Sequence, residues 1–303
     1  MTLAPIVLFT YARLDHTRRT IEALLCNLNV ESHDLIVFSD GPRSSEDENA
    51  VNQVREYLST VSGFRTVSIH NRHYNHGLSR SIISGVTEVL HSYERIIVLE
   101  DDMVTSRYFL TYMNQALDLF ANDERIISIH GYVYPVLGNL PEAFFLLGAD
   151  CWGWGTWRRG WALFNEDGRF LLAELKRRKL LYLFDFNNSY GFSKMLKNQI
   201  SGLNDSWAIR WYASAFLLGK MTLYPGRSLV FNIGNDSTGI HCLTTKSFDS
   251  DLSEFEINLK NLDVKVSDYA FNKFVDFFRR SKGSWLSRIW SQAKGLFINR
   301  FYG

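Results

Sequence analysis

The segment 95–102 constrains this chain more than any other, because a buried strand runs directly into three acids. Residues 96–99 are four consecutive large apolar residues, a run typical of a strand buried on both faces of a mostly parallel sheet. Glu100, Asp101 and Asp102 then stand where open α/β sheets bind their ligands. Because adjacent carboxylates repel one another, the triplet predicts a compensating cation, and hard oxygen ligands suit Mg²⁺ or Mn²⁺.

A helix cap is the simpler alternative for the triplet. Asp102 could open a helix that continues through Phe109, Tyr112 and Met113, where its carboxylate would accept hydrogen bonds from free backbone N–H groups. On the triplet alone we favour a metal site over a plain cap.

Length and composition exclude several classes of protein. The chain has 303 residues, 46% of them hydrophobic, and a net charge of +1, which allows a large core but argues against a nucleic-acid binder that relies on a broad basic surface. No apolar run approaches the roughly 20 residues of a membrane span, and the first residues lack the pattern of a signal peptide. Three widely spaced cysteines predict neither a zinc ribbon nor a disulfide framework, so we expect a reducing cytoplasm.

The first hundred residues alternate between apolar strands and amphipathic helices. Strands are expected at 6–10, 34–40, 64–70 and 95–99, with helices at 15–25, 49–58 and 78–91 between them. This order predicts a right-handed, doubly wound, parallel sheet. The chain has no GxGxxG after the first strand and no GxxxxGK[ST], which argues against a dinucleotide site and a P-loop.

The second half has a different character. Four tryptophans crowd between Gly148 and Gly168, a helix is expected over 169–183, and short strands are expected at 221–224 and 229–232. Because no linker rich in Pro, Gly or Ser intervenes, we expect both halves to share one continuous sheet.

The tail, residues 269–303, alternates aromatic and basic side chains. On a helix this pattern gives an apolar stripe, which includes Phe274, Phe277 and Phe278, beside a basic flank. Such a helix suits an anionic membrane surface. A helix packed on the domain, with its basic residues in water, gives the same pattern, so spacing leaves both alternatives open.

Polar side chains follow each of the four expected strands of the first half. They are Thr10 and Arg13, then Asp40, then His73, Asn75 and Arg80, and finally Glu100, Asp101 and Asp102. Since the carboxyl ends of parallel strands meet at one edge, this set suits a nucleoside diphosphate. Asp40 can accept from a uracil N–H, Arg13 or Arg80 can offset phosphate charge, and a cation can bridge the diphosphate oxygens. Asp40 before Gly41-Pro42 could instead be a turn residue, and each histidine could be structural.

This ordered set resembles a GT-A glycosyltransferase. The motifs are Asp40 ending the second strand, Asn75-x-Gly77-Leu78 opening a helix, and the acid triplet 100–102 ending the fourth strand. They look like those of the large family-2 glycosyltransferases of bacterial surface polysaccharide synthesis, and several are similar to motifs of the N-acetylglucosaminyltransferase I family. The likeness covers roughly residues 4–242.

The resemblance implies a fold and a division of the chain. The fold is α/β, of the GT-A (Rossmann-like) type, with a mostly parallel central sheet flanked by helices and a helical C-terminal extension. Residues 1–245 would form the glycosyltransferase domain, with 1–104 as the nucleotide-sugar half and 105–245 as the acceptor half. Residues 246–303 would form the aromatic and basic extension.

The resemblance also implies roles for single residues. Asp102 would bind Mn²⁺, and Asp40 and His73 would contact uracil. Thr10, Arg13, Asn75, Arg80, Glu100 and Asp101 complete the expected nucleotide-sugar site. The segment 148–157 resembles an acceptor-side loop, in which Trp152 and Trp154 offer flat faces for sugar stacking; a local aromatic core is the alternative for these rings.

Two further residues come from the resemblance. Asp205, in Asn204-Asp205-Ser206-Trp207, matches the general base; a simple N-cap is its other reading and is compatible with catalysis. The usual acid before it is replaced by Asn204. His241, in a Gly-rich loop at 234–241, would touch the diphosphate or complete the metal shell, although its spacing differs and an ordinary loop histidine fits as well.

The expected activity is an inverting, metal-dependent transfer of a sugar from a UDP-sugar to a hydroxyl of a glycan or glycolipid. Mn²⁺ or Mg²⁺ would be the cofactor, and the motifs favour GlcNAc or another hexose. The expected location is the cytoplasm, with peripheral contact to the inner face of the plasma membrane through the tail. A sugar nucleotidyltransferase is the first alternative, but the loop after the first strand lacks glycine. A non-catalytic sugar-binding module is the second.

Overall fold

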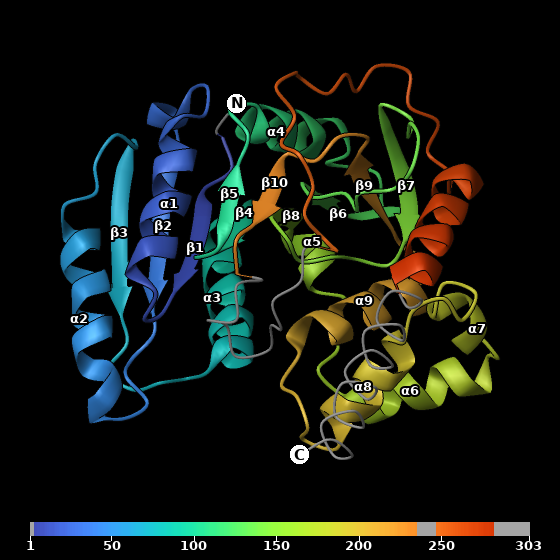
Figure 1. Ribbon diagram of the computed structural model, residues 1–303, viewed down its shortest axis with the longest axis horizontal. Helices are drawn as coiled ribbons and strands as arrows, with labels where there is room; N and C mark the ends of the chain where they lie inside the picture. The colour runs from blue at the N-terminus through green and yellow to red at the C-terminus, as the bar shows by residue number, and fades with distance from the viewer. Residues whose placement is uncertain (1–2, 235–246, 282–303) are drawn as a thin grey trace, which may run out of the picture.

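In the described part of the chain, a sheet of eight strands forms the centre of the molecule (Figure 1). The computed structural model describes residues 3–234 and 247–281. The strand order is β3-β2-β1-β4-β8-β6-β9-β7. The strands are β1 (Ile6–Thr10), β2 (Asp34–Ser39), β3 (Thr66–Asn71), β4 (Arg95–Glu100), β6 (Ile126–His130), β7 (Ala143–Leu147), β8 (Trp154–Trp157) and β9 (Met221–Pro225).

The first four strands of the sheet are parallel, as the sequence predicts. In β1, Ile6 pairs with Leu35 on one side and with Ile97 on the other, and β2 continues in parallel to β3. The chain starts at β1, moves outward through β2 to β3, and then crosses back to β4 on the other side of β1. The order therefore reverses between β1 and β4, which is the place where doubly wound sheets bind ligands.

The other half of the sheet is mixed. β8 is antiparallel to both β4 and β6, β6 is parallel to β9, and β7 closes the edge antiparallel to β9. The prediction of one continuous, mostly parallel central sheet flanked by helices is confirmed. The tryptophan-rich segment was expected as a loop, but residues 154–157 form a central strand, because Gly155 fits between Ile97 and Ile129 on the neighbouring strands.

A second, two-stranded sheet follows the acid triplet. It pairs β5 (Met103–Thr105) with β10 (Val230–Asn232) in antiparallel fashion. The next helix, α4, begins only at Phe109. The alternative in which Asp102 caps a helix is therefore wrong, because the chain leaves the triplet as a strand.

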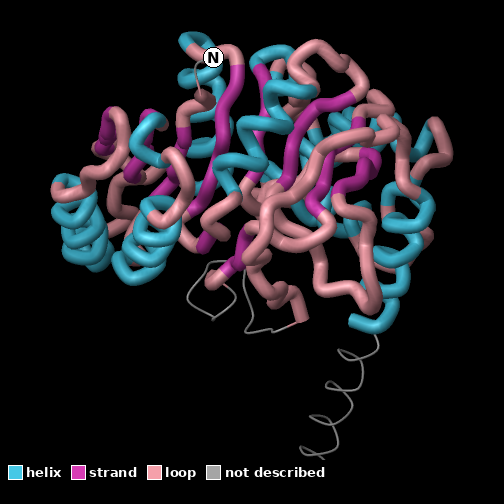
Figure 2. Tube along the Cα trace, turned by 90° about the horizontal axis from the view of Figure 1, so that it is seen from above, coloured by secondary structure: helices cyan, strands magenta, loops and turns pink. Residues whose placement is uncertain are grey.

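Helices cover both faces of the sheet (Figure 2). They are α1 (Leu14–Leu25), α2 (Ser45–Ser59), α3 (Leu78–Ser92), α4 (Phe109–Leu119), α5 (Arg158–Trp161), α6 (Gly168–Arg177), α7 (Leu181–Phe184), α8 (Phe192–Ile200) and α9 (Trp207–Leu217), with a 3₁₀ turn η1 (Val30–Ser32). The helix expected over 169–183 is broken between α6 and α7, where Lys179 takes a left-handed conformation with φ 57°.

Alternate residues of the parallel strands enter two separate cores. Ile6 and Leu8 of β1 pack toward α1, α2 and α4, whereas Val7 and Phe9 pack toward α3 and α9. Both faces of each strand are thus buried, which explains the continuous apolar runs in the sequence.

The last described helix, residues 268–281, packs beside β7 and β9. Phe274, Phe277 and Phe278 are buried in a third core with Phe144 of β7 and Tyr224 of β9. These three rings are therefore out of reach of a lipid surface, and for this part of the tail the packed-helix alternative holds. Residues 282–303 lie outside the described residues. Within the described ranges, none of the helices combines the length and the apolar character that crossing a bilayer requires.

We predict that Phe274→Ala lowers the free energy of unfolding by about 3–5 kcal/mol, the cost typical of deleting a buried ring. Phe274 is 1% exposed, and the matched control Phe255→Ala removes a ring that is 67% exposed, so it should change stability little. Urea unfolding followed by circular dichroism measures both variants. Equal stability of the two variants would contradict the packing of this helix.

Candidate functional site

The candidate site lies at the carboxyl edge of the sheet, where β1 and β4 end side by side. Phe9 of β1 is in register with Glu100 of β4, so the turn after Thr10 and the acid triplet share one edge. Backbone contacts fix the triplet: the Thr20 hydroxyl donates to the carbonyl of Asp101 at 2.8 Å, and the Ile233 N–H donates to the carbonyl of Asp102 at 2.9 Å. Helix α1 and the residue that follows β10 thus meet at the acids.

Arg13 binds both aspartates of the triplet. Its Nη2 donates to Asp101 Oδ1 and, at 2.8 Å, to Asp102 Oδ2. Both carboxylates are largely buried, and the arginine side chain is 22% exposed. One guanidinium nitrogen therefore bridges two carboxylates and reduces the repulsion between them.

Two polar atoms at this edge are buried and have no hydrogen-bond partner among the described residues. They are Asp102 Oδ1 and Thr10 Oγ1. Buried polar atoms normally have partners, so an unpartnered acceptor can take a hydrogen bond or bind an ion. The two oxygens of Asp102 therefore differ: Oδ2 accepts from Arg13, whereas Oδ1 is available to a cation.

The charges of the triplet perturb one another. Loss of solvation, followed by the negative charges of Asp102 and Asp101, raises the pKa of Glu100 to about 8. Loss of solvation also raises the pKa of Asp101, against the opposing effect of Arg13. Burial opposes the charge of Arg13, but Asp101 and Asp102 outweigh it and raise the pKa of the guanidinium. The site therefore carries excess negative charge that one arginine does not remove.

The residues of this edge fit a divalent cation in chemistry, although a full ligand set is not in place. Carboxylate oxygens are the ligands that Mg²⁺ and Mn²⁺ prefer, and Asp102 Oδ1 is free to serve. In residues 3–234 and 247–281, no group of three His, Cys, Asp or Glu side chains stands ready to hold a metal. His241, the second predicted ligand, lies outside the described residues.

Asp40 organises the loop that precedes α3. Its two carboxylate oxygens accept from the backbone N–H groups of Gly41, His76 and Gly77, at 2.9–3.1 Å. Asn75 strengthens the same turn, because its Nδ2 donates to the Gly41 carbonyl at 2.8 Å. Gly41 itself is required there, since a Cβ would stand 2.5 Å from the backbone carbon of Tyr74.

This geometry changes the expectation for Asp40. Its carboxylate is buried and all of its acceptor directions point at backbone amides, so the structure favours an anchoring role over direct contact with a base. The uracil contact stays a prediction. His73 and Arg80 of the same segment are exposed, which leaves both side chains able to reach a ligand.

Asp205 stands immediately before α9, with its side chain 68% exposed. The cap of α9 is Ser206, whose hydroxyl accepts from the Ile209 N–H, so the N-cap reading of Asp205 is wrong by one residue. Asn204 Oδ1 accepts from the Ser206 N–H at 3.0 Å, and this turn presents the Asp205 carboxylate to solvent. An exposed carboxylate at a fixed position suits a general base.

Arg210 connects Asp205 with the start of α3. Its Nη2 donates to the Ser79 hydroxyl at 2.6 Å and lies 3.9 Å from Asp205 Oδ1. Ser79 is in the first turn of α3, two residues after Gly77, which Asp40 holds. Asp40 and Asp205 therefore flank the start of the same helix. Sequence reasoning missed Arg210, whose buried pairing joins residues 131 positions apart.

The predicted sugar-stacking tryptophans have different surroundings. Trp154 is 1% exposed and packs against Trp161, Trp207 and Trp211, so the stacking prediction is wrong for this residue: no sugar can reach a ring inside the core. Trp152 is half-buried, and its ring packs edge to face on the Tyr132 ring, with 4.7 Å between the ring centroids. Its stacking role stays a prediction.

The loop that carries Trp152 reaches the acidic edge. Loss of solvation, together with the negative charges of Asp150, Glu100 and Asp102, raises the pKa of the Cys151 thiol well above its usual value. The backbone gives the same placement, because Trp154 at the end of this loop pairs with Val98 of β4, so the loop and the triplet lie at the same edge of the sheet. Cys151 stays a neutral thiol there.

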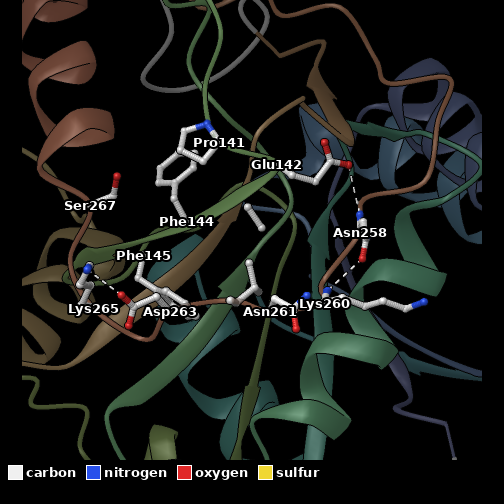
Figure 3. A pocket seen from close by; sticks show the side chains of 12 residues that line it. Pro141, Glu142, Phe144, Phe145, Asn258, Lys260, Asn261, Asp263, Lys265 and Ser267 are labelled. Atoms are coloured by element: carbon white, nitrogen blue, oxygen red, sulfur yellow. Dashed lines mark hydrogen bonds and ion pairs between the residues drawn. The ribbon is translucent and has the colours of Figure 1, made fainter.

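A pocket of about 400 Å³ lies away from these residues (Figure 3). It is lined by residues 141–145 at the start of β7 and by the segment 258–267. Its polar groups pair with one another: the Asn258 N–H donates to Glu142, and Lys265 pairs with Asp263. None of the predicted site residues lines this pocket, so the candidate site remains at the carboxyl edge of β1 and β4.

No protein-family model and no curated protein matches this chain. Solved structures that are similar to it include a mannosyltransferase from Pyrobaculum calidifontis in complex with GDP-Man and Mn²⁺, at 9% identity and a TM-score of 0.31, over 44% of this chain and 36% of that chain. This chain thus spans about a third of that protein's length.

Two further structures give similar values. One, from Desulfovibrio desulfuricans, is provisionally named a nucleotide-diphospho-sugar transferase, at 12% identity and a TM-score of 0.33, over 55% of this chain and 69% of that chain. The other is a cytidylyltransferase from Leptospira borgpetersenii, at 12% identity and a TM-score of 0.32, over 54% and 63%. At TM-scores this low the likeness decides no function, and the assignment rests on the chain's own residues.

We predict that Asp40→Asn lowers the free energy of unfolding by about 1–3 kcal/mol, because the new amide group would face backbone N–H donors and leave one of them without an acceptor. Amide hydrogen exchange at His76 and Gly77 should accelerate. The control Asp251→Asn changes an exposed aspartate and should leave both measurements unchanged. Unaltered exchange at these two amides would contradict the anchoring role.

The raised pKa of Glu100 predicts a pH-dependent stability. Between the ordinary pKa of 4.5 and the folded value of about 8, the folded state holds a proton that the unfolded state releases. The free energy of unfolding should therefore fall as the pH rises through this window. In Glu100→Gln this fall should be smaller, and chemical unfolding at several pH values in EDTA measures it. Glu254→Gln, at an exposed site, should keep the wild-type slope; a wild-type slope in Glu100→Gln would refute the perturbation.

Proposed function

We propose that this chain is an inverting, metal-dependent glycosyltransferase of the GT-A type, which moves GlcNAc or another hexose from a UDP-sugar to a hydroxyl of a glycan or glycolipid. One observation carries the proposal: at the β1/β4 reversal of the sheet, Asp101 and Asp102 are held together by Arg13 while Asp102 Oδ1 keeps a free, buried acceptor position. A dianionic leaving group and its cation need such a place.

The donor would lie along the carboxyl edge of β1, β2 and β4. Arg13 and the exposed Arg80 supply positive charge for the diphosphate, and the turn held by Asp40 shapes the end where the nucleoside would bind. His73 and Asn75, on the same turn, and Thr10, with its unpartnered hydroxyl, complete the donor contacts that we propose. Burial and the neighbouring aspartates raise the pKa of Glu100 and favour its protonated form, which limits the negative charge that the donor would meet.

Asp102, with His241 as a further candidate, would hold Mn²⁺ or Mg²⁺. The cation, when bound, supplies Lewis-acid stabilisation of the charge that develops on the leaving diphosphate. The remaining chemistry belongs to the chain's own groups.

Asp205 would act as the general base. As the acceptor oxygen bonds to the anomeric carbon, Asp205 takes the hydroxyl proton, the bond from that carbon to the UDP oxygen breaks, and UDP leaves with the electron pair. Attack from the face opposite UDP inverts the anomeric centre. A single exposed carboxylate suffices for this reaction, since no protein nucleophile is needed, and Asn204 in place of a second acid agrees with that.

The acceptor would approach over the loop that carries Trp152, whose half-buried ring we propose as a stacking surface. Residues 1–104 would serve the donor and 105–245 the acceptor, with 246–303 as the extension. By the resemblance to surface-polysaccharide enzymes we place the reaction at the cytoplasmic face of the plasma membrane. Any peripheral contact there would fall to residues beyond 281, because the aromatic stripe before them is buried.

The test is release of UDP from UDP-GlcNAc and related donors in the presence of Mn²⁺. Asp205→Asn should lower kcat by about 10²–10⁴-fold, the range typical of losing a general base, and Asp102→Asn or EDTA should abolish metal-stimulated turnover. Asp251→Asn serves as the exposed control. Proton NMR of the product should show the opposite anomeric configuration to the donor.

Metal-independent turnover, or full activity in both Asp102→Asn and Asp205→Asn, would overturn this mechanism. Release of pyrophosphate from a nucleoside triphosphate and a sugar phosphate, without any glycosyl transfer, would instead indicate a sugar nucleotidyltransferase.

A further inference from the structure

Arg13 occupies the position at which a cation would neutralise the aspartates. A single nitrogen, Nη2, contacts both carboxylates, as one point of positive charge placed between two negative ones. On Asp102 it takes Oδ2 and leaves Oδ1 without a partner in the described part of the chain. The pairing is therefore incomplete on the metal-binding residue.

The pair is also enclosed. The main chain of Arg13 is fixed at the start of α1, because its carbonyl accepts from the N–H and the hydroxyl of Thr17, each at 2.9 Å. On another side lies Gly234, where a Cβ would stand 2.1 Å from Asp102 Oδ2 and 3.2 Å from Arg13 Nη1. Only the far end of the arginine side chain has freedom to leave.

The charges at the site favour a divalent ion over Arg13 as the partner of Asp102. Asp101 and Asp102 alone carry two negative charges against the one positive charge of Arg13. A divalent ion has twice the charge of a guanidinium and approaches an oxygen more closely, at about 2.0–2.2 Å. It is therefore the stronger partner for Asp102, but the positive charge of Arg13 on Oδ2 opposes its binding at Oδ1 of the same carboxylate.

We infer that Arg13 is a built-in competitor of the metal: it holds Asp101 and Asp102 together before loading, lowers the affinity of Asp102 for a divalent cation, and is released toward the donor diphosphate when the cation binds. This inference rests on the proposed function for the identity of the site. It adds that Arg13 sets the metal affinity and couples metal binding to the capture of the phosphates. Removal of a competing partner must strengthen binding of the other, by linkage.

Metal binding without any donor tests the inference directly. We expect Arg13→Met to bind Mn²⁺ at least about 10-fold more tightly than wild type, measured by titration calorimetry and by the loss of the free Mn²⁺ signal in electron paramagnetic resonance. The matched control is Arg19→Met, which removes the same charge from α1, the helix that Arg13 precedes. Arg19 is 50% exposed and, among the ion pairs of the described chain, pairs only with Asp15 at 3.9 Å. The affinity of this control variant should stay within about twofold of wild type.

A second measurement uses the wild-type protein, so that it does not depend on a variant that folds. Phenylglyoxal modifies free arginine side chains, and mass spectrometry locates the product. Mn²⁺ should accelerate modification of Arg13 and leave Arg19 unchanged. A rate at Arg13 that Mn²⁺ leaves unchanged or lowers would overturn the inference.

The outcomes separate this inference from the proposed function. If wild type binds Mn²⁺ and Arg13→Met binds it no more tightly, the competition is refuted while the metal site stands. If only Arg13→Met binds Mn²⁺, the competition is supported in its strongest form. If neither binds Mn²⁺ at millimolar concentration, both the competition and the metal requirement of the proposed function are refuted.

Discussion

The confinement of three carboxyl groups at the end of one buried strand governs the rest of this molecule. β4 is covered on both faces and paired on both sides, so the acids that follow it cannot spread apart by moving the backbone. Their repulsion is met in three ways: Glu100 keeps a proton, Arg13 bridges Asp101 and Asp102, and one oxygen of Asp102 is left for a further positive charge.

The remaining parts of the site are arranged around this edge by backbone contacts rather than by chance proximity. Asp40 gives up its carboxylate to hold the turn before α3, and Arg210 then joins α3 to the start of α9, where Asp205 stands. Hydrogen bonds thus connect the end of the second strand with α3 and α9, and a 3.9 Å ion pair extends them to the proposed base. Helices and strands thus fix the positions of the site residues. Among these residues, Arg80 and Asp205 are exposed, so their side chains are able to contact a ligand.

The sequence predicts the parallel half of this fold well, because apolar runs of strand length alternate with helical periodicity over residues 6–100. It also marks the triplet correctly as the end of a strand. It fails where the decisive partner is distant. Trp154 looks like a surface aromatic beside glycines, but it is a core residue of a central antiparallel strand. The pairing of Arg13 with acids nearly ninety positions away, and the backbone partners of Asp40, depend on folded geometry that no local pattern encodes.

The central claim is that Asp102, beside Arg13 at the β1/β4 edge, binds the cation, and that the donor diphosphate binds next to it. A crystal grown with Mn²⁺ and UDP, measured at the manganese absorption edge, tests it most directly. The account predicts an anomalous peak within bonding distance of Asp102 Oδ1, with the diphosphate beside it and the Arg13 guanidinium turned toward the phosphates. A peak at another place, or a diphosphate bound while Arg13 still bridges the two aspartates, would contradict it.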